Sequence, residues 1–190
     1  MIYLVTGQQQ LFESDLYKVI SIEESLQLLN SCKILQYDSE TSCKNPYFGN
    51  ILCIQFGNKE KDFQLVVDTI TIDILKYKDI LETKPLIGHN LKFDLQWLYN
   101  HKIIPRKVYD TMIVEQLLYM GFPRLPITPE RYTKYNYDFP YKIIISKEGN
   151  TYYELSYSLQ SLVSKYLNIN IDKTVRGEII WRGLDSKVIE

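Results

Sequence analysis

Two acidic residues stand one residue apart at the end of an apolar stretch, in the run Tyr37-Asp38-Ser39-Glu40-Thr41. Residues i and i+2 of a β-strand project from the same face, so we expect the carboxylates of Asp38 and Glu40 to lie side by side. Adjacent carboxylates repel unless one is protonated or a cation bridges them. Mg²⁺ or Mn²⁺, which prefer oxygen ligands, would suit such a pair. From the residues alone, the alternative is a solvated strand end with a turn-forming aspartate.

A second polar pair, Asn90 and Asp94, follows the short apolar stretch 86–88. Four residues apart, the two side chains share one face of a helix. Because this helix starts directly after a strand, we expect it to start at the edge of the sheet, beside Asp38 and Glu40. Asn90 also stands where a helix N-cap is favoured, and that structural role can hold in addition.

A third acidic residue, Asp110, follows a short predicted strand and opens a predicted helix. Aspartate is a favoured N-cap residue, because its carboxylate accepts a hydrogen bond from a backbone N–H of the first helical turn. We therefore favour N-capping over metal ligation for Asp110.

Strand and helix patterns alternate along the chain. Apolar and β-branched stretches predict strands at residues 2–5, 33–38, 51–56, 63–67, 86–88 and 108–109. Periodic apolar residues and caps predict helices at residues 22–29, 72–81, 91–101, 112–120 and 159–167. A meander followed by strands that alternate with helices indicates an α/β fold with a mixed sheet. Residues 121–157 break this alternation and predict a β-hairpin inserted between two helices.

The composition excludes several classes of protein. The 190 residues include 22 Lys and Arg against 23 Asp and Glu, a net charge of −1, so this is not a basic protein that coats nucleic acid by charge alone. Three cysteines without a C-x-x-C spacing suggest neither a thiolate zinc site nor a disulfide framework, and two histidines exclude a site of three imidazoles. No signal-peptide pattern and no apolar stretch of ~20 residues is present. We expect a cytoplasmic protein without membrane contact.

Together, these residues resemble the DEDD (DnaQ-like) superfamily of 3′–5′ exonucleases. Asp38-Ser39-Glu40 is similar to the first exonuclease motif, and Asn90-Leu91-Lys92-Phe93-Asp94 is similar to the second. Further stretches resemble the proofreading domains of family A DNA polymerases and RNase D, namely residues 110–118, 158–167 and 172–174 and Trp181. The resemblance covers residues 33–120 and 157–190. It implies an RNase H-like fold, a mixed five-stranded sheet flanked by helices, in the cytoplasm of a bacterium or a phage-infected cell.

The resemblance also implies a mechanism, in which two divalent metal ions, Mg²⁺ or Mn²⁺, lie ~3.5–4 Å apart and assist phosphodiester hydrolysis. Asp38 would bridge both ions, Glu40 would bind the ion that activates water, and Asp94 would help to hold the second ion. These three residues are the candidate catalytic and metal-binding set.

The implied substrate is the 3′ end of single-stranded DNA, with RNA as an alternative that the residues do not distinguish. Unpaired bases stack on aromatic rings, so Tyr47 and Phe48 are candidates to wedge the terminal bases. Packing of the turn before the next strand is their alternative role. Asn90 and Thr41 are the other candidate substrate contacts. Asp110 is a candidate residue that supports the metal ligands without binding the metal itself.

Tyrosines and basic residues interleave in the inserted segment 121–157, whose net charge is +1, from five basic and four acidic residues. The seven tyrosines are Tyr132, Tyr135, Tyr137, Tyr141, Tyr152, Tyr153 and Tyr157. They suggest either a platform that binds a nucleic-acid strand or a covering for the hairpin, and we favour the covering.

The third motif of the family, Y-x-x-x-D or H-x-x-x-x-D, has no independent match. No tyrosine stands four residues before an aspartate, and His89 with Asp94 falls within the second motif. We expect a single exonuclease-like domain over residues 1–190 that stops before this motif, with a polymerase domain downstream or in trans as its partner. Proofreading by a family A-like DNA polymerase is the function that we expect first. An RNase D-like RNA exonuclease and a nucleic-acid-binding module that does not cut are the alternatives.

Overall fold

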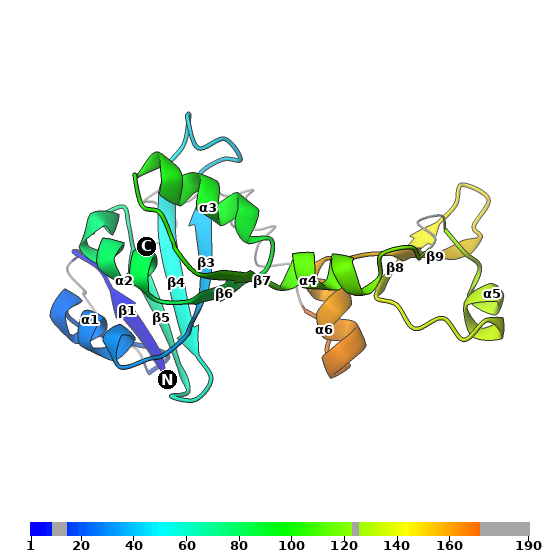
Figure 1. The fold of residues 1–190 in the computed structure, drawn as a ribbon, viewed down its shortest axis with the longest axis horizontal. Coiled ribbons are helices and arrows are strands. Elements are labelled where there is room, and N and C mark those ends of the chain that lie inside the picture. Colours follow the sequence, from blue (N-terminus) through cyan, green and yellow to red (C-terminus); the bar gives the residue numbers. More distant parts are fainter. Residues whose placement is uncertain (9–14, 123–125, 172–190) are drawn as a thin grey trace. The chain divides into compact units, whose positions relative to one another are not determined.

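The computed structural model describes residues 1–8, 15–122 and 126–171. The chain divides into two compact units, Met1–Thr111 and Met112–Glu190, which are described separately (Figure 1). The expectation of one domain over residues 1–190 stays a prediction. None of the described helices is long and apolar enough to cross a membrane.

The first unit is built on a mixed sheet with the strand order β2-β1-β5-β4-β3-β6-β7. Its strands are β1 (Ile2–Val5), β2 (Lys18–Val19), β3 (Leu35–Thr41), β4 (Ile51–Asn58), β5 (Phe63–Asp68), β6 (Leu86–Gly88) and β7 (Val108–Asp110). β3, β4 and β5 form an antiparallel meander, and the other neighbours pair in parallel. The predicted α/β class with a mixed sheet is confirmed. The described sheet has seven strands, however, where the resemblance implies five.

The two additional strands extend the sheet beyond β5. β1 pairs in parallel with β5, with Ile2 opposite Gln64 and Val5 opposite Val67, and β2 pairs in turn with β1. The local pattern of residues 2–5 predicts a strand but not the edge that it joins, because strand pairing depends on contacts between residues far apart in sequence.

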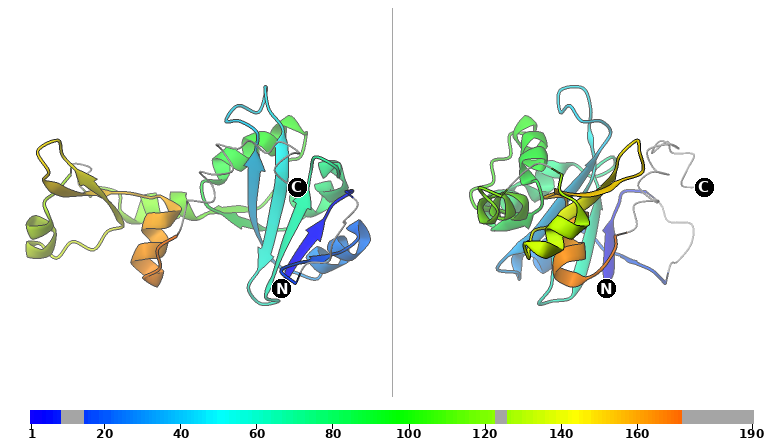
Figure 2. Two further views of the ribbon diagram at one scale, coloured as in Figure 1. Left: turned by 180° about the vertical axis from the view of Figure 1, so that it is seen from behind. Right: turned by 90° about the vertical axis from the view of Figure 1, so that its right-hand side faces the viewer.

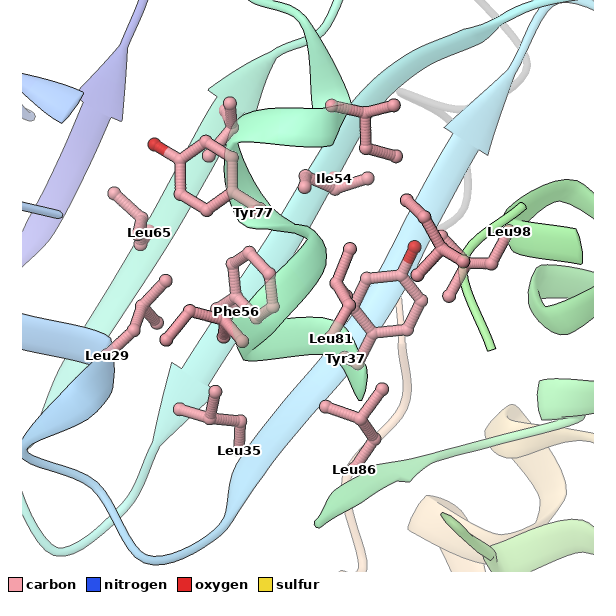
Figure 3. Close-up of a cluster of buried hydrophobic side chains, with 14 of the residues drawn as sticks. Leu29, Leu35, Tyr37, Ile54, Phe56, Leu65, Tyr77, Leu81, Leu86 and Leu98 are labelled. Carbon is pink, nitrogen blue, oxygen red and sulfur yellow. The ribbon is translucent and has the colours of Figure 1, made fainter. Parts of the chain in front are cut away.

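Strand β3 alternates between the core and the opposite face of the sheet. Leu35 and Tyr37 are buried, whereas Asp38 is exposed. The ring of Tyr37 packs against Phe56 of β4, with the centroids 5.6 Å apart (Figure 3). Because side chains alternate along a strand with a period of two, the burial of Leu35 and Tyr37 directs Asp38 and Glu40 away from this core.

Helices contribute side chains to the same core. They are α1 (Ile22–Asn30), the 3₁₀ helix η1 (Ile74–Tyr77), α2 (Lys78–Thr83) and α3 (Leu91–Asn100). Figure 3 shows Leu29, Tyr77, Leu81 and Leu98 from these helices around Ile54, Phe56 and Leu65 of the sheet. This shared core fixes α3, and with it the second motif, against the sheet.

Two predicted helix starts have different outcomes. The helix predicted at residues 22–29 is confirmed as α1 and begins with a capping box: Ser21 Oγ accepts a hydrogen bond from the Glu24 N–H (3.0 Å), and Glu24 Oε2 accepts one from the Ser21 N–H (2.8 Å). The helix predicted over residues 72–81 is instead η1 followed by the short α2. Asp73 caps η1 by accepting a hydrogen bond from the Leu75 N–H (2.9 Å).

The second unit holds the inserted hairpin between helices. Its elements are α4 (Thr111–Leu118, which begins at the last residue of the first unit), α5 (Pro129–Lys134), β8 (Tyr141–Ile145), β9 (Thr151–Leu155) and α6 (Leu159–Leu167). The antiparallel pair β8–β9 confirms the predicted hairpin. Helix α5 was not predicted from the pattern, although Thr128 caps it and Pro129 occupies its first turn, which are ordinary helix-start signals.

Aromatic rings of the second unit pack mainly on one another. The Tyr132 ring centroid lies 5.1 Å from that of Phe139 and 5.2 Å from those of Tyr141 and Tyr153. Tyr141 and Tyr153 stack across the hairpin at 4.2 Å. These contacts favour the covering role of the tyrosines over an open strand-binding platform.

Candidate active site

Asp38 and Glu40 lie on one face of β3 near its C-terminal end. Asp38 is exposed and Glu40 is half-buried, and the two residues lie opposite Gln55 and Cys53 of β4. The pairing register shifts between Glu40 and Thr41, and such irregularities bend a strand where its pairing ends. The structure therefore brings the two carboxylates of the first motif together at this end of the sheet.

Asp94 lies in the first turn of α3 and is only 3% exposed. Its Oδ1 accepts two hydrogen bonds from Ser39, one from the backbone N–H (3.0 Å) and one from the hydroxyl (2.6 Å). β6 pairs with β3 at residues 35 and 36 only, so the next part of the β3 edge faces α3 and the Ser39 N–H finds its acceptor there. These hydrogen bonds hold the Asp94 carboxylate next to Ser39, the residue between Asp38 and Glu40.

Burial, together with the negative charge of Asp38, raises the pKa of Asp94 from 3.8 to about 6. The hydrogen bonds from Ser39 act in the opposite direction, because they favour the ionised carboxylate. Asp94 and Asp38 are therefore close enough for each charge to affect the other, and a bound cation would relieve this repulsion.

Asp110 is tied to the start of α3. Its Oδ1 accepts a hydrogen bond from the Asn90 N–H at 2.9 Å. Asn90 has a left-handed backbone (φ 62°, ψ 40°), which asparagine adopts more readily than most residues. The Asn90 side chain makes no capping hydrogen bond, so the expected side-chain cap is wrong, although the residue does occupy the N-cap position.

Sequence reasoning missed three residues that support this site. His89 Nδ1 and Thr111 Oγ1 share a hydrogen bond of 2.9 Å, and Thr111 Oγ1 donates to the carbonyl of Gly88 (3.1 Å). A Cβ at Gly88 would lie 2.5 Å from Leu91 Cδ2 and 2.7 Å from the Tyr37 carbonyl oxygen. Glycine therefore lets α3 approach β3 closely, and a glycine two residues before the second motif was the signal that could have revealed this.

The loop between β3 and β4 presents Tyr47 and Phe48 to solvent. Their side chains are 83% and 86% exposed. The alternative in which they pack the turn is therefore wrong. Thr41, just before this loop, donates a hydrogen bond from its hydroxyl to the Cys43 carbonyl (2.8 Å), so its side chain helps to shape the loop.

The acidic residues are of the type that binds Mg²⁺, but those in the described part of the chain do not form a complete metal site. Carboxylate oxygens are the ligands that Mg²⁺ prefers. Within residues 1–8, 15–122 and 126–171, however, no three His, Cys, Asp or Glu side chains form a group that could hold a metal ion. The stretch 172–174 and Trp181, which contribute to the resemblance, lie outside the described residues. Metal binding by Asp38, Glu40 and Asp94 stays a prediction.

Sequence relatives include two bacterial proteins. DNA polymerase I of Aquifex aeolicus (strain VF5) is 33% identical over 104 residues, which are 54% of this chain and 17% of that protein. DNA polymerase I of Borreliella burgdorferi (strain ATCC 35210 / DSM 4680 / CIP 102532 / B31) is 28% identical over 142 residues, which are 69% of this chain and 16% of that protein. The matched part thus spans only about a sixth of the length of these relatives.

Solved structures share the fold at low sequence identity. The catalytic core of RRP6 from Trypanosoma brucei has a TM-score of 0.60 at 14% identity, over 93% of this chain and 37% of that one. The Aedes aegypti Nibbler EXO domain has a TM-score of 0.57 at 12% identity, over 92% and 72%. Escherichia coli RNase D has a TM-score of 0.54 at 16% identity, over 80% and 32%. These likenesses show an RNase H-like exonuclease fold.

The family itself follows from the sequence match. The sequence model of the family described as 3′–5′ exonuclease, of the type found in family A DNA polymerases, matches residues 17–178. This range includes both exonuclease motifs and most of the chain. The protein therefore belongs to the DnaQ-like 3′–5′ exonuclease domain family, related to the exonuclease domain of DNA polymerase I and to RNase D and RRP6.

Proposed function

We propose that this chain hydrolyses phosphodiester bonds at the 3′ end of single-stranded DNA, as the proofreading domain of a family A-like DNA polymerase. The observation that supports this best is the pair of hydrogen bonds from Ser39 to Asp94, which joins the second motif to the first. The preference for DNA comes from the sequence relatives, both of which are named DNA polymerase I.

We propose Asp38, Glu40 and Asp94 as ligands of two divalent ions, Mg²⁺ or Mn²⁺. Ions bound there would stabilise the charges on the attacking and the leaving oxygens. The protein's own part is positioning. The sheet presents Asp38 and Glu40 to solvent and substrate, and Ser39 holds Asp94 through donors that favour its ionised form.

The mechanism of this family also needs a fourth acidic ligand and a tyrosine or histidine that orients water. The sequence has no Y-x-x-x-D run that would supply both. We therefore propose that residues 1–190 act as one exonuclease-like domain, completed by a polymerase chain in cis or in trans. By itself the 190-residue chain should bind metal weakly and turn over slowly.

Two other functions remain candidates. Escherichia coli RNase D is described as an exoribonuclease involved in structured RNA processing, and the shared fold makes RNA the second candidate substrate. The missing third motif favours a third candidate, a module that binds a nucleic-acid strand without cutting it.

The test is a shortening assay with 5′-labelled single-stranded DNA and RNA of one sequence, in Mn²⁺. The 190-residue chain and a version extended to its natural stop are each compared with their Asp38→Asn variants. We expect DNA to be shortened faster than RNA, and the extended version to act faster than the 190-residue chain. The Asp38→Asn variants should act at least roughly 100-fold more slowly, because they lose a ligand of the metal ions that would stabilise the charges on the attacking and leaving oxygens.

Asp62→Asn is the matched control. Asp62 is an exposed aspartate in the β4–β5 turn with φ 47°, a conformation that asparagine accepts. Shortening that survives Asp38→Asn would contradict the assigned site. Fast shortening by the 190-residue chain alone would contradict the incomplete ligand set, and binding of DNA without shortening by either version would favour the binding module.

A further inference from the structure

A groove of about 670 Å³ lies between the loop that follows β3 and the C-terminal end of α3. One wall is formed by residues 44–47 of the loop, and the other by Gln96, Tyr99, Asn100 and Lys102. The loop and this helix lie side by side in both Figure 1 and Figure 2. The groove therefore belongs to the two elements that carry the first and second motifs.

The loop is held firmly on α3. Asn100 Nδ2 donates a hydrogen bond to the Pro46 carbonyl at 2.8 Å. A Cβ at Gly49 would lie 3.0 Å from the Trp97 ring, so the loop backbone packs directly against the helix. Tyr47 therefore presents an exposed ring on a loop that is anchored to α3.

The lining of the groove matches the chemistry of a single nucleic-acid strand. Tyr47 and Tyr99, whose side chains are 83% and 51% exposed, offer ring faces for bases. Lys44 and Lys102 are exposed and offer positive charge for phosphates. No acidic residue is among the described residues that line the groove. The local charge is therefore positive in a protein whose net charge is −1.

Along the axis of α3, the groove lies a short distance from Asp94. Asp94 is in the first turn of α3, and Asn100 is its last residue. Six residues at 1.5 Å each separate the two by about 9 Å along the helix. This is the length of about three stacked nucleotides at 3.4 Å each.

We propose that this groove is a second strand-binding site, which holds single-stranded nucleic acid a few nucleotides upstream of the 3′ end. Bases stack on Tyr47 and Tyr99, and Lys44 and Lys102 neutralise phosphates. The inference extends the proposed function, because it places the strand on a path that leads to Asp38, Glu40 and Asp94.

The test measures binding apart from hydrolysis. Fluorescence anisotropy in EDTA follows 5′-labelled oligo(dT) and oligo(U) of two, four, eight and twelve nucleotides with the full 190-residue chain. The groove variants are Lys44→Gln/Lys102→Gln and Tyr47→Ala. The control variants are Lys59→Gln/Lys61→Gln, two exposed lysines in the β4–β5 turn at the opposite end of β4, and Tyr135→Ala, a half-exposed ring of the second unit.

We expect affinity to rise steeply between two and about four nucleotides and then to level, because a strand whose 3′ end lies at the carboxylates must be about that long to contact the groove as well. Loss of both lysines should reduce the slope of log K against log salt by about 1.4, at about 0.7 per phosphate contact on a single strand. Tyr47→Ala should weaken binding roughly 5- to 150-fold, which corresponds to ~1–3 kcal/mol per stacked base. The control variants should bind like the unmodified chain.

The outcomes separate this inference from the proposed function. The proposed strand-binding role of the groove would be overturned if the groove variants bind all lengths like the controls, or if the unmodified chain binds no oligonucleotide. Either result would count against it even if the chain shortens DNA in Mn²⁺. Binding that depends on the groove lysines and on Tyr47 would support the inference even if neither the chain nor its extended version cuts DNA or RNA. Equal affinity for oligo(dT) and oligo(U) would support a groove that reads the strand without regard to its sugar.

Discussion

At the scale of single residues, Asp94 is the most buried of the three candidate metal ligands. It is buried, near the charge of Asp38, and held by two hydrogen bonds from Ser39. These contacts place the carboxylate well for a cation but leave its charge poorly solvated when no cation is bound. The same residue should therefore reduce the stability of the metal-free protein at neutral pH.

Asp94→Asn should make the metal-free protein more stable above pH 6. The pKa of Asp94 is raised from 3.8 to about 6 in the folded protein, so between these values the folded state binds more protons than the unfolded state. The stability that this group contributes is full below pH 3.8, falls as the pH rises, and is lost above about 6. Asparagine can still accept both hydrogen bonds from Ser39. We expect a gain of roughly 1–3 kcal/mol at pH 7.5, measured by urea unfolding in EDTA, and a loss of exonuclease activity.

At pH 5 the same comparison should give a smaller difference, because Asp94 is then mostly protonated. Asp62→Asn, which changes an exposed carboxylate, should alter the free energy of unfolding by less than about 0.5 kcal/mol. A gain for Asp94→Asn that is larger at pH 5 than at pH 7.5 would contradict this account.

At the scale of secondary-structure elements, the close approach of α3 to β3 decides whether the two motifs meet. Gly88 ends β6 just before α3, and Thr111 donates a hydrogen bond to its carbonyl. Asp110 holds the Asn90 N–H, so β7 and the start of α4 position the start of α3. The second motif thus depends on a neighbouring strand as well as on its own sequence.

Gly88→Ala should push α3 away from β3. The new Cβ would meet the Tyr37 carbonyl oxygen at 2.7 Å, and this backbone atom cannot move aside as a flexible side chain would. We expect a loss of about 1–3 kcal/mol in the free energy of unfolding, as for other overpacked sites. Because Asp94 moves with α3, exonuclease activity should fall more than stability explains. Urea unfolding and the shortening assay of the extended version measure the two effects.

Gly7→Ala is the control, because its new Cβ would come no closer than 3.3 Å, to Thr71 Cβ. Equal effects of the two substitutions on unfolding and on activity would show that Gly88 has no particular role in placing α3.

At the scale of the whole molecule, the two units have separate apolar clusters. The core of the first unit lies between the sheet and its helices, whereas the aromatic cluster of the second unit centres on Tyr132. Each unit therefore has its own source of stability, and a substitution in one cluster should act mainly on that unit.

Tyr132→Ala should loosen the second unit alone. The substitution removes ring contacts to Phe139, Tyr141 and Tyr153, at a cost of roughly 2–4 kcal/mol. Hydrogen exchange followed by mass spectrometry should show faster exchange in α5, β8 and β9 and unchanged exchange in β3, β4 and β5. Tyr135→Ala, at a more exposed ring, should have a much smaller effect. Faster exchange throughout the sheet after Tyr132→Ala would show that the units do not unfold separately.

Much of the local structure could be predicted from local patterns. The capping box of Ser21 and Glu24, the β8–β9 hairpin and the shared face of Asp38 and Glu40 all depend on residues close in sequence. The two exonuclease motifs likewise consist of short runs. Predictions failed where one residue type is compatible with two local structures. Asn90 stands at the N-cap position, but its side chain does not form the expected capping hydrogen bond.

The amino-acid sequence by itself determined the strand and helix patterns, the two motifs and the absence of a third, because periodicity, capping and motif spacing act over a few residues. Only the tertiary structure decided that Ser39 binds Asp94 across 55 positions, that β1 joins β5, and that Tyr47 and Tyr99 line one groove. These contacts join residues far apart in sequence. They form only when the packed core has fixed which face each strand buries and how closely α3 approaches the sheet.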